Sequence, residues 1–175
     1  MEYSISLYKI NQDNTARFAL GNKTGKPLIV IGLNPSTADD RKADPTIRKV
    51  MGFAEGSGFD SFIMLNLYPQ RTPNPDELHY ELDTDIMQEN LVAIKSVLEE
   101  ISDPVFLASW GETIKIRKYF KECIKQIHEL TKDKNVKWMK IGNLTKTGHP
   151  RHPLYPAYAL GLSDFDIKKY IEKLK

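Results

Sequence analysis

Side chains suited to chemistry follow a strongly apolar run near the start of the chain. Ile29–Gly32 leads into Asn34, which is followed at once by Pro35, Ser36 and Thr37. A continuous apolar run is typical of a parallel strand buried on both faces, and ligands of open α/β sheets bind beyond the carboxyl ends of such strands. An amide forms hydrogen bonds but does not act as a general base, so Asn34 is predicted to orient a ligand or a water molecule. The alternative is a plain Asn-Pro turn.

Three further apolar runs, over residues 62–67, 105–110 and 136–141, also end near polar or aromatic side chains. The carboxyl ends of parallel strands meet at one edge of a sheet, so these side chains are predicted to converge on Asn34. Together with Pro35, Ser36 and Thr37, the predicted ligand contacts are Asn66, Arg71, Trp110, Lys146 and Arg151. The three cations would meet phosphates, although each alone is also an ordinary surface cation.

Two of these residues have strong structural alternatives. Asn66 follows four apolar residues, and a buried amide needs hydrogen-bond partners whether or not a ligand supplies them. Ligand contact and a tie between two loops therefore both remain open for Asn66. Trp110 ends an apolar run, which favours packing in the core over stacking on a base.

Asp44 is the predicted general base, if the protein is catalytic. It stands beyond the Asn-Pro turn together with Asp39 and Asp40, and it directly precedes Pro45. Aspartate before a proline at the first helical position is also a typical helix N-cap, which is the favoured interpretation of Asp44. A carboxylate in this place would accept a proton from an attacking water.

His149 and His152 lie two residues apart in a loop that also carries Arg151 and Lys146. A two-histidine metal site is one interpretation, but the sequence offers no strong third ligand, so no metal is assigned. Stabilisation of an anion or oxyanion is better supported, because cations and histidine donors gather at one predicted strand end. We assign this catalytic role to His152.

Alternating strands and helices must position these groups. Strands are predicted over residues 3–10, 17–20, 28–32, 62–67, 105–110 and 136–141, and helices over residues 45–56, 83–101, 112–130 and from Ser163, as N-cap, to Lys173. This order predicts one α/β domain over residues 1–175: three α/β/α layers around a mainly parallel sheet, with N-terminal antiparallel strands at its edge.

The composition is that of an ordinary globular protein. The 175 residues carry a net charge of +2, with 41% hydrophobic and 27% charged residues. A single cysteine excludes an intrachain disulfide, a cysteine-ligated zinc site and an iron–sulfur cluster, and no cofactor is assigned. No apolar run has the length of a membrane span, and no signal-peptide pattern opens the chain, so a cytoplasmic protein without membrane partners is expected. The oligomeric state stays open.

Several of these segments carry a family resemblance. The motifs are Asn34-Pro-Ser-Thr-Ala-Asp39, Asp44-Pro-Thr-Ile-Arg48, Asn66-Leu67, Trp110-Gly111 and Arg151-His-Pro-Leu-Tyr155, and together they resemble a bacterial and phage domain family of unknown function. More distantly, Gly32-Leu-Asn-Pro-Ser36 and His149-Pro-Arg-His-Pro153 resemble the first and last motifs of the uracil-DNA glycosylase superfamily.

The distant resemblance implies a glycosylase-like fold and a specific chemistry. In that superfamily the first motif positions the attacking water, an asparagine at the next strand end contacts the flipped base, and the closing histidine stabilises charge on the base carbonyl. Asn34, Asn66 and His152 would take these roles on DNA or a free nucleotide. This chain departs from the pattern because no aromatic closely follows the first motif, and because Asn34 stands where the most active branch has aspartate. A non-catalytic module that binds nucleic acid or nucleotide is the competing hypothesis, and an enzyme acting on a small phosphorylated metabolite is the third.

Overall fold

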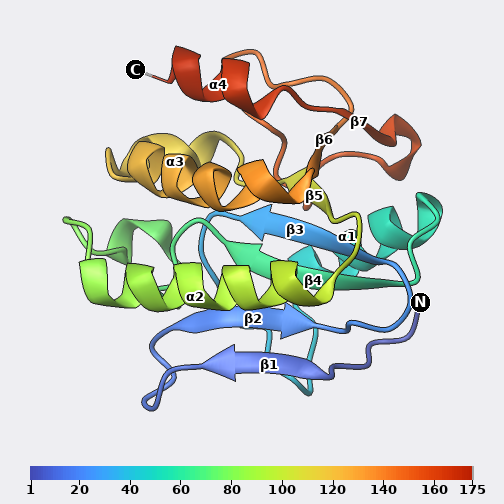
Figure 1. Cartoon of the computed structure of the whole chain (residues 1–175), viewed down its shortest axis with the longest axis horizontal. Helices are drawn as coiled ribbons and strands as arrows, with labels where there is room; N and C mark the ends of the chain where they lie inside the picture. The colour runs from blue at the N-terminus through green and yellow to red at the C-terminus, as the bar shows by residue number, and fades with distance from the viewer. Residues whose placement is uncertain (175) are drawn as a thin grey trace.

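A computed structural model describes residues 1–174, which contain one seven-stranded mixed sheet in the order β1-β2-β4-β3-β5-β6-β7. Four central strands run parallel: β3 (Pro27–Gly32), β4 (Ser61–Asn66), β5 (Val105–Ala108) and β6 (Lys137–Ile141). β1 (Leu7–Ile10) and β2 (Arg17–Gly21) form an antiparallel edge, as predicted. The structure thereby confirms a mixed α/β fold (Figure 1).

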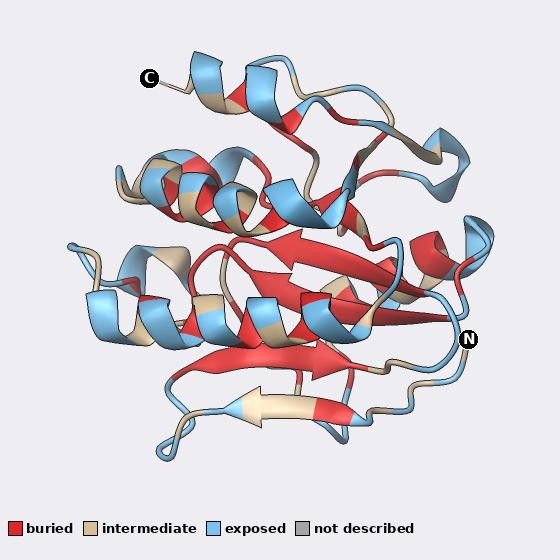
Figure 2. Ribbon diagram, in the orientation of Figure 1, coloured by how far each residue is buried: buried red, intermediate tan, exposed pale blue. Residues whose placement is uncertain are grey.

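The central strands are buried on both sides because their side chains serve two cores. Ile29 and Ile31 join the core on one face of the sheet, whereas Leu28 and Val30 join the core on the other. This division follows from the period of two along a strand. Figure 2 shows the central strands in the colour of buried residues, with exposed residues on the outer sides of the helices.

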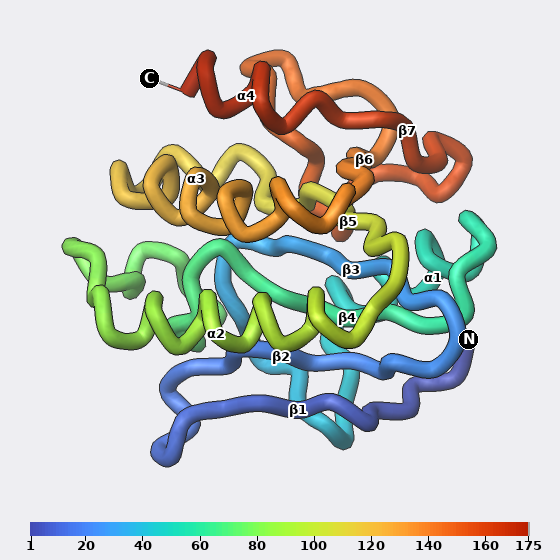
Figure 3. Tube along the Cα trace, in the orientation of Figure 1, coloured from blue at the N-terminus to red at the C-terminus, as the bar shows by residue number. Residues whose placement is uncertain are grey.

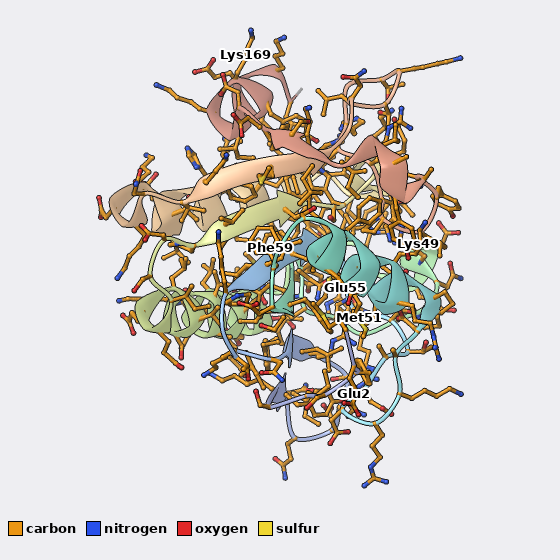
Figure 4. All side chains as sticks on the ribbon, turned by 90° about the vertical axis from the view of Figure 1, so that its right-hand side faces the viewer. Glu2, Lys49, Met51, Glu55, Phe59 and Lys169 are labelled. Atoms are coloured by element: carbon orange, nitrogen blue, oxygen red, sulfur yellow. The ribbon has the colours of Figure 1, made fainter. Side chains whose placement is uncertain are left out.

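Helices cover both faces. On one face lie α2 (Thr84–Glu100), α3 (Phe120–Thr131) and α4 (Ile167–Lys173), whose apolar residues join the first core. On the other lies α1 (Pro45–Gly56), which buries Ile47, Val50, Phe53 and Ala54. In Figure 4 the sheet lies between α2 and α1, which carries the labelled Lys49, Met51 and Glu55.

One predicted helix is wrong in part. Residues 112–130 form a 3-10 turn over Glu112–Ile116, an extended break at Arg117, and only then α3. The guanidinium of Arg117 donates to the carbonyl oxygens of Asp76, Leu78 and His79, at 2.7–3.0 Å. These long-range bonds hold the 3-10 turn Pro75–Glu77 and the segment after it, and they compete with a continuous helix.

The C-terminal edge also differs from the prediction. Ser163 was expected to cap the last helix, but it lies in β7 (Leu162–Asp164), which pairs antiparallel with β6. Its hydroxyl donates to Gly142 O at 2.9 Å, and Asp166 caps α4 instead by accepting from Lys169 N. Figure 3 follows the chain from β6 through residues 142–161 into β7 and α4, at the opposite end of the molecule from β1.

Gly32, at the end of β3, permits the close approach of β4. A Cβ on Gly32 would lie 2.4 Å from Met64 Cε and 2.8 Å from the side-chain amide of Asn66, both in buried residues. Gly32→Ala is therefore expected to cost about 1–3 kcal/mol of unfolding free energy by overpacking, measured by urea denaturation. Gly56→Ala is the matched control, because nothing lies within 4 Å of its Cβ and alanine favours a helix. Equal stability of the two variants would contradict the expected crowding.

Candidate functional site

A cleft of about 480 Å³ opens where the parallel strands end. Its lining comes from the segment after β3, the start of α1, the turn after β5 and the long segment between β6 and β7. Its volume falls within the usual range of small-molecule sites, about 300–1,000 Å³. Of the predicted site residues, the structure brings Asn34, Ser36, Asp44, Trp110, Arg151 and His152 to this cleft.

Asn34 is held in one orientation by the loop that follows β4. Its Nδ2 donates to Pro35 O at 3.0 Å and Thr72 O at 2.9 Å, with Gln70 O at 3.4 Å. Because the amide nitrogen faces these carbonyl groups, Oδ1 is the free end of the side chain, and it has no hydrogen-bond partner within residues 1–174. Asn34 is thus both a loop tie and an available acceptor in the cleft wall.

Asn66 is a buried residue that links neighbouring segments by hydrogen bonds and does not line the cleft. It is fully buried at the end of β4, opposite Gly32 in the strand pairing. With its amide nitrogen turned toward acceptors, it donates to Asn34 O and Leu65 O, both at 3.3 Å. Asn90 in α2 in turn donates to the backbone oxygen of Asn66 at 3.0 Å. The side chain of Asn66 therefore has protein acceptors for its amide nitrogen, and Asn66 is not among the residues that line the cleft.

Asp44 combines two roles. As the predicted N-cap of α1, it accepts a hydrogen bond from Ile47 N at 2.8 Å through Oδ1. The same half-buried carboxylate lines the cleft, and its charge acts on both Arg17 and His152. Capping uses one carboxylate oxygen, which leaves the other to accept a hydrogen bond or a proton from a ligand.

His152 is held as a hydrogen-bond donor. Leu154 N donates to Nδ1 at 3.3 Å, so the neutral ring carries its proton on Nε2. Burial lowers the pKa of His152, and the nearby charge of Asp44 opposes that shift only in part. A neutral imidazole with a free Nε2–H can donate to an oxygen on which negative charge develops.

The side chains of His149 and Trp110 form a separate hydrogen-bond network, although Trp110 also lies in the cleft wall. The indole Nε1–H of Trp110 donates to Tyr170 Oη at 3.0 Å, and the Tyr170 hydroxyl lies 2.7 Å from His149 Nδ1. His149 lines a different cavity, between α4 and residues 144–149. Trp110 is fully buried among Trp138, Phe165 and Tyr170, which is its core role and leaves no face for a base. Within residues 1–174, no cluster of histidine, cysteine and acidic side chains is arranged to hold a metal ion.

Besides Asn66, four predicted contacts lie outside the cleft: Pro35, Thr37, Arg71 and Lys146. All five N–H groups of Arg71 have protein acceptors: Ser36 O, Thr37 O, Ala38 O, the Tyr8 hydroxyl and Asn14 Oδ1. Arg71 therefore clamps the segment after Asn34 and has no donor left for a phosphate. Pro35 is buried, while Thr37 and Lys146 are exposed, and none of the three lines the cleft.

Three charged or aromatic cleft residues were not predicted from the sequence: Arg17, Glu112 and Tyr155. Arg17 lines the cleft although only 2% of it is exposed. It begins β2, which runs antiparallel to β4, so the start of β2 lies at the edge where the parallel strands end. Tyr155 lines the rim with 83% of its surface exposed, and its ring centroid is 5.9 Å from that of His152. Its position in the Arg-His-Pro-Leu-Tyr motif was the available signal.

Glu112 adds a fixed negative charge to the rim. Hydrogen bonds from Lys115, Thr145 and Thr147 lower its pKa to about 2. Glu112 therefore stays ionised at neutral pH and does not serve as a general acid. Glu112 thus contributes an acceptor to the rim, whereas His152 and Arg151 contribute donors to the cleft.

These features define a mixed α/β protein with a candidate ligand-binding cleft at the carboxyl edge of its parallel strands. Residues 17–154 match the family described as "Protein of unknown function (DUF1643)", and the chain belongs to that family. Membership in a domain family of unknown function is thereby confirmed, and the matched span includes Asn34, Asp44 and His152. Neither a curated protein nor a solved structure matches the chain. No helix within residues 1–174 has the length and apolar character needed to cross a membrane.

Proposed function

We propose that the cleft binds a nucleobase-bearing ligand and hydrolyses its N-glycosidic bond. The observation that carries this proposal is the convergence of Asn34, Asp44 and His152, from three separate segments, on one cleft of about 480 Å³. A free amide oxygen, a carboxylate and a neutral imidazole donor are the groups that such a hydrolysis needs. The distant resemblance of two motifs, at Gly32–Ser36 and His149–Pro153, to those of the uracil-DNA glycosylase superfamily supports the same chemistry and a glycosylase-like fold.

The proposed reaction uses each side chain once. A water held by Asn34 Oδ1 attacks the anomeric carbon, and Asp44 takes the proton that the water loses. The bond between this carbon and the base nitrogen breaks, and its electron pair leaves with the base. His152 Nε2–H donates to the base oxygen on which the charge develops, and the released base takes up a proton from solvent. A base in DNA must leave the helical stack before it enters the cleft.

The experiment is an assay of base release. Oligonucleotides that contain uracil, hypoxanthine or a mismatch are followed on gels for abasic sites, and free nucleotides are followed by chromatography. Asp44→Asn is expected to reduce the rate by about 100-fold, since a general base contributes about 10²–10⁴. Asparagine caps helices as well as aspartate does, so α1 is expected to persist.

Asp83→Asn is the matched control, because Asp83 caps α2 in the same way and does not line the cleft. A full rate in Asp44→Asn would remove this residue as the base. Absence of base release from every DNA and nucleotide substrate would reject the hydrolysis.

A non-catalytic binding module is the second candidate function. The observation that favours it is the fixed role of Asn34 as a loop tie, which explains this residue without any reaction. The module predicts binding of DNA or nucleotide without released base. Binding to DNA through phosphates would also weaken steeply as the salt concentration rises.

A further inference from the structure

Arg17 is a buried cation whose side chain has unused hydrogen-bond donors. Only 2% of the residue is exposed, and within residues 1–174 it forms no salt bridge. One hydrogen bond is present, from Nη1 to Ala38 O at 2.6 Å, and Nε is buried without any partner. Burial of a charged group with unused donors is costly, and an anion that enters the cleft would offset this cost.

The charges around Arg17 add to the energetic cost of its buried guanidinium. Its neighbour Arg71 is a second cation whose N–H groups are all taken by neutral oxygens. Burial and the charge of Arg71 lower the pKa of Arg17 to about 10, while Asp44 opposes the shift. Asp44 is the carboxylate whose charge acts on Arg17, and it already caps α1, whereas the charge of Arg71 acts on Asp39.

We propose that Arg17 binds the terminal phosphate of a nucleoside monophosphate, which would be the substrate class of the cleft. The nucleobase half of this assignment rests on the function proposed above. An arginine fork binds phosphate oxygens through two N–H groups, and such charge-assisted bonds are among the stronger hydrogen bonds in proteins.

The burial of Arg17 favours a terminal phosphate over a phosphate of the DNA backbone. A phosphodiester within a strand must enter and leave a site, whereas Arg17 is 98% covered by protein. A phosphate at the end of a small ligand reaches such a group alone. The exposed ring of Tyr155 stands at the rim beside His152, so the phosphate would point inward and the base would lie at the mouth.

The test compares nucleotides with nucleosides by calorimetry. AMP, GMP, IMP, UMP and CMP, their nucleosides, inorganic phosphate and a single-stranded oligonucleotide are titrated into the wild-type protein. For one or more of the monophosphates, the Kd is expected to be about tenfold or more below that of the corresponding nucleoside. Arg17→Gln keeps a donor for Ala38 O and is expected to bring this ratio to about one. Arg41→Gln, an exposed arginine outside the cleft, is expected to preserve it.

A second measurement applies even if Arg17→Gln fails to fold. Inorganic phosphate is expected to raise the melting temperature of the wild type and of Arg17→Lys more than chloride does at equal ionic strength. Equal affinity for nucleotide and nucleoside, or a preference that survives in folded Arg17→Gln, would overturn the phosphate assignment. If Arg151→Gln loses the preference for nucleotide over nucleoside and Arg17→Gln keeps it, the phosphate binds at Arg151. If the oligonucleotide binds more tightly than every monophosphate and Arg17→Gln weakens that binding, Arg17 binds a backbone phosphate. Phosphate binding at Arg17 without binding of any nucleoside or nucleotide would retain the anion site and reject the proposed function.

Discussion

Asn34→Asp is expected to destabilise the protein by about 2–4 kcal/mol. The change replaces an N–H donor by a carboxylate oxygen, which would face the carbonyl oxygens of Pro35 and Thr72 that Asn34 now satisfies. Loss of both bonds removes the Asn34 donor from Thr72 O, while Pro35 O keeps its bond from Thr72 N, and the new negative charge repels both carbonyl oxygens. Thermal and urea denaturation at neutral pH would measure the effect.

The comparison with Asn34→Ala separates repulsion from a lost bond. Alanine removes the donor without adding charge, so Asn34→Ala is expected to be more stable than Asn34→Asp at neutral pH. The gap should narrow in acid, where a protonated carboxyl group can donate one hydrogen bond. Equal stability of Asn34→Asp and the wild type would show that the amide does not hold the loop. The aspartate of the most active glycosylase branch is thus not expected to transfer into this site.

The fold was largely predictable because its strongest signals are local. Continuous apolar runs mark β3 and β4, and Asp44-Pro45 marks the start of α1 where the structure places it. β7 was missed because Leu162-Ser163-Asp164 is too short to show a period and is held by its pairing with β6. The break at Arg117 depends on carbonyl groups about 40 residues earlier in the chain, which no local pattern reveals.

The site was predictable only where parallel strands end. That rule brought Asn34 and His152 to one cleft, but it also selected Arg71, whose donors are consumed by the loop it clamps. The rule passed over Arg17, because an antiparallel strand begins at the edge where parallel strands finish. A residue type and a strand end therefore predict location, while the hydrogen bonds already made inside the protein decide which groups remain free for a ligand.

His152→Asn is expected to reduce base release by about 10²–10³-fold, the cost of removing one donor to a developing oxyanion. The asparagine side chain can place an acceptor where Nδ1 accepts from Leu154 N, so the loop is expected to persist. It is too short to replace Nε2–H. His152→Gln does the opposite: its amide can place a donor at the position of Nε2, but it leaves Leu154 N without an acceptor. More activity in His152→Gln than in His152→Asn would assign the effect to the donor, and equal rates in both variants and the wild type would contradict it.

The pH profile supplies an independent check. Because burial lowers the pKa of His152, the ring remains neutral as pH falls to values at which an exposed histidine is charged. Activity is therefore expected to stay flat down to about pH 6.5, the ordinary histidine pKa, and to fall only at lower pH, as Nδ1 gains a proton and loses its bond from Leu154 N. The unfolded chain binds that proton more readily, so stability contributed by neutral His152 is complete above about pH 6.5 and is lost as the pH falls toward the folded pKa. The same sign applies to His128 and His149, whose pKa values are also lowered. The free energy of unfolding is measured against pH for the wild type and His152→Asn. A smaller slope in the variant would give the contribution of His152. An unchanged slope would show that its ring titrates in the folded protein as it does in the unfolded chain.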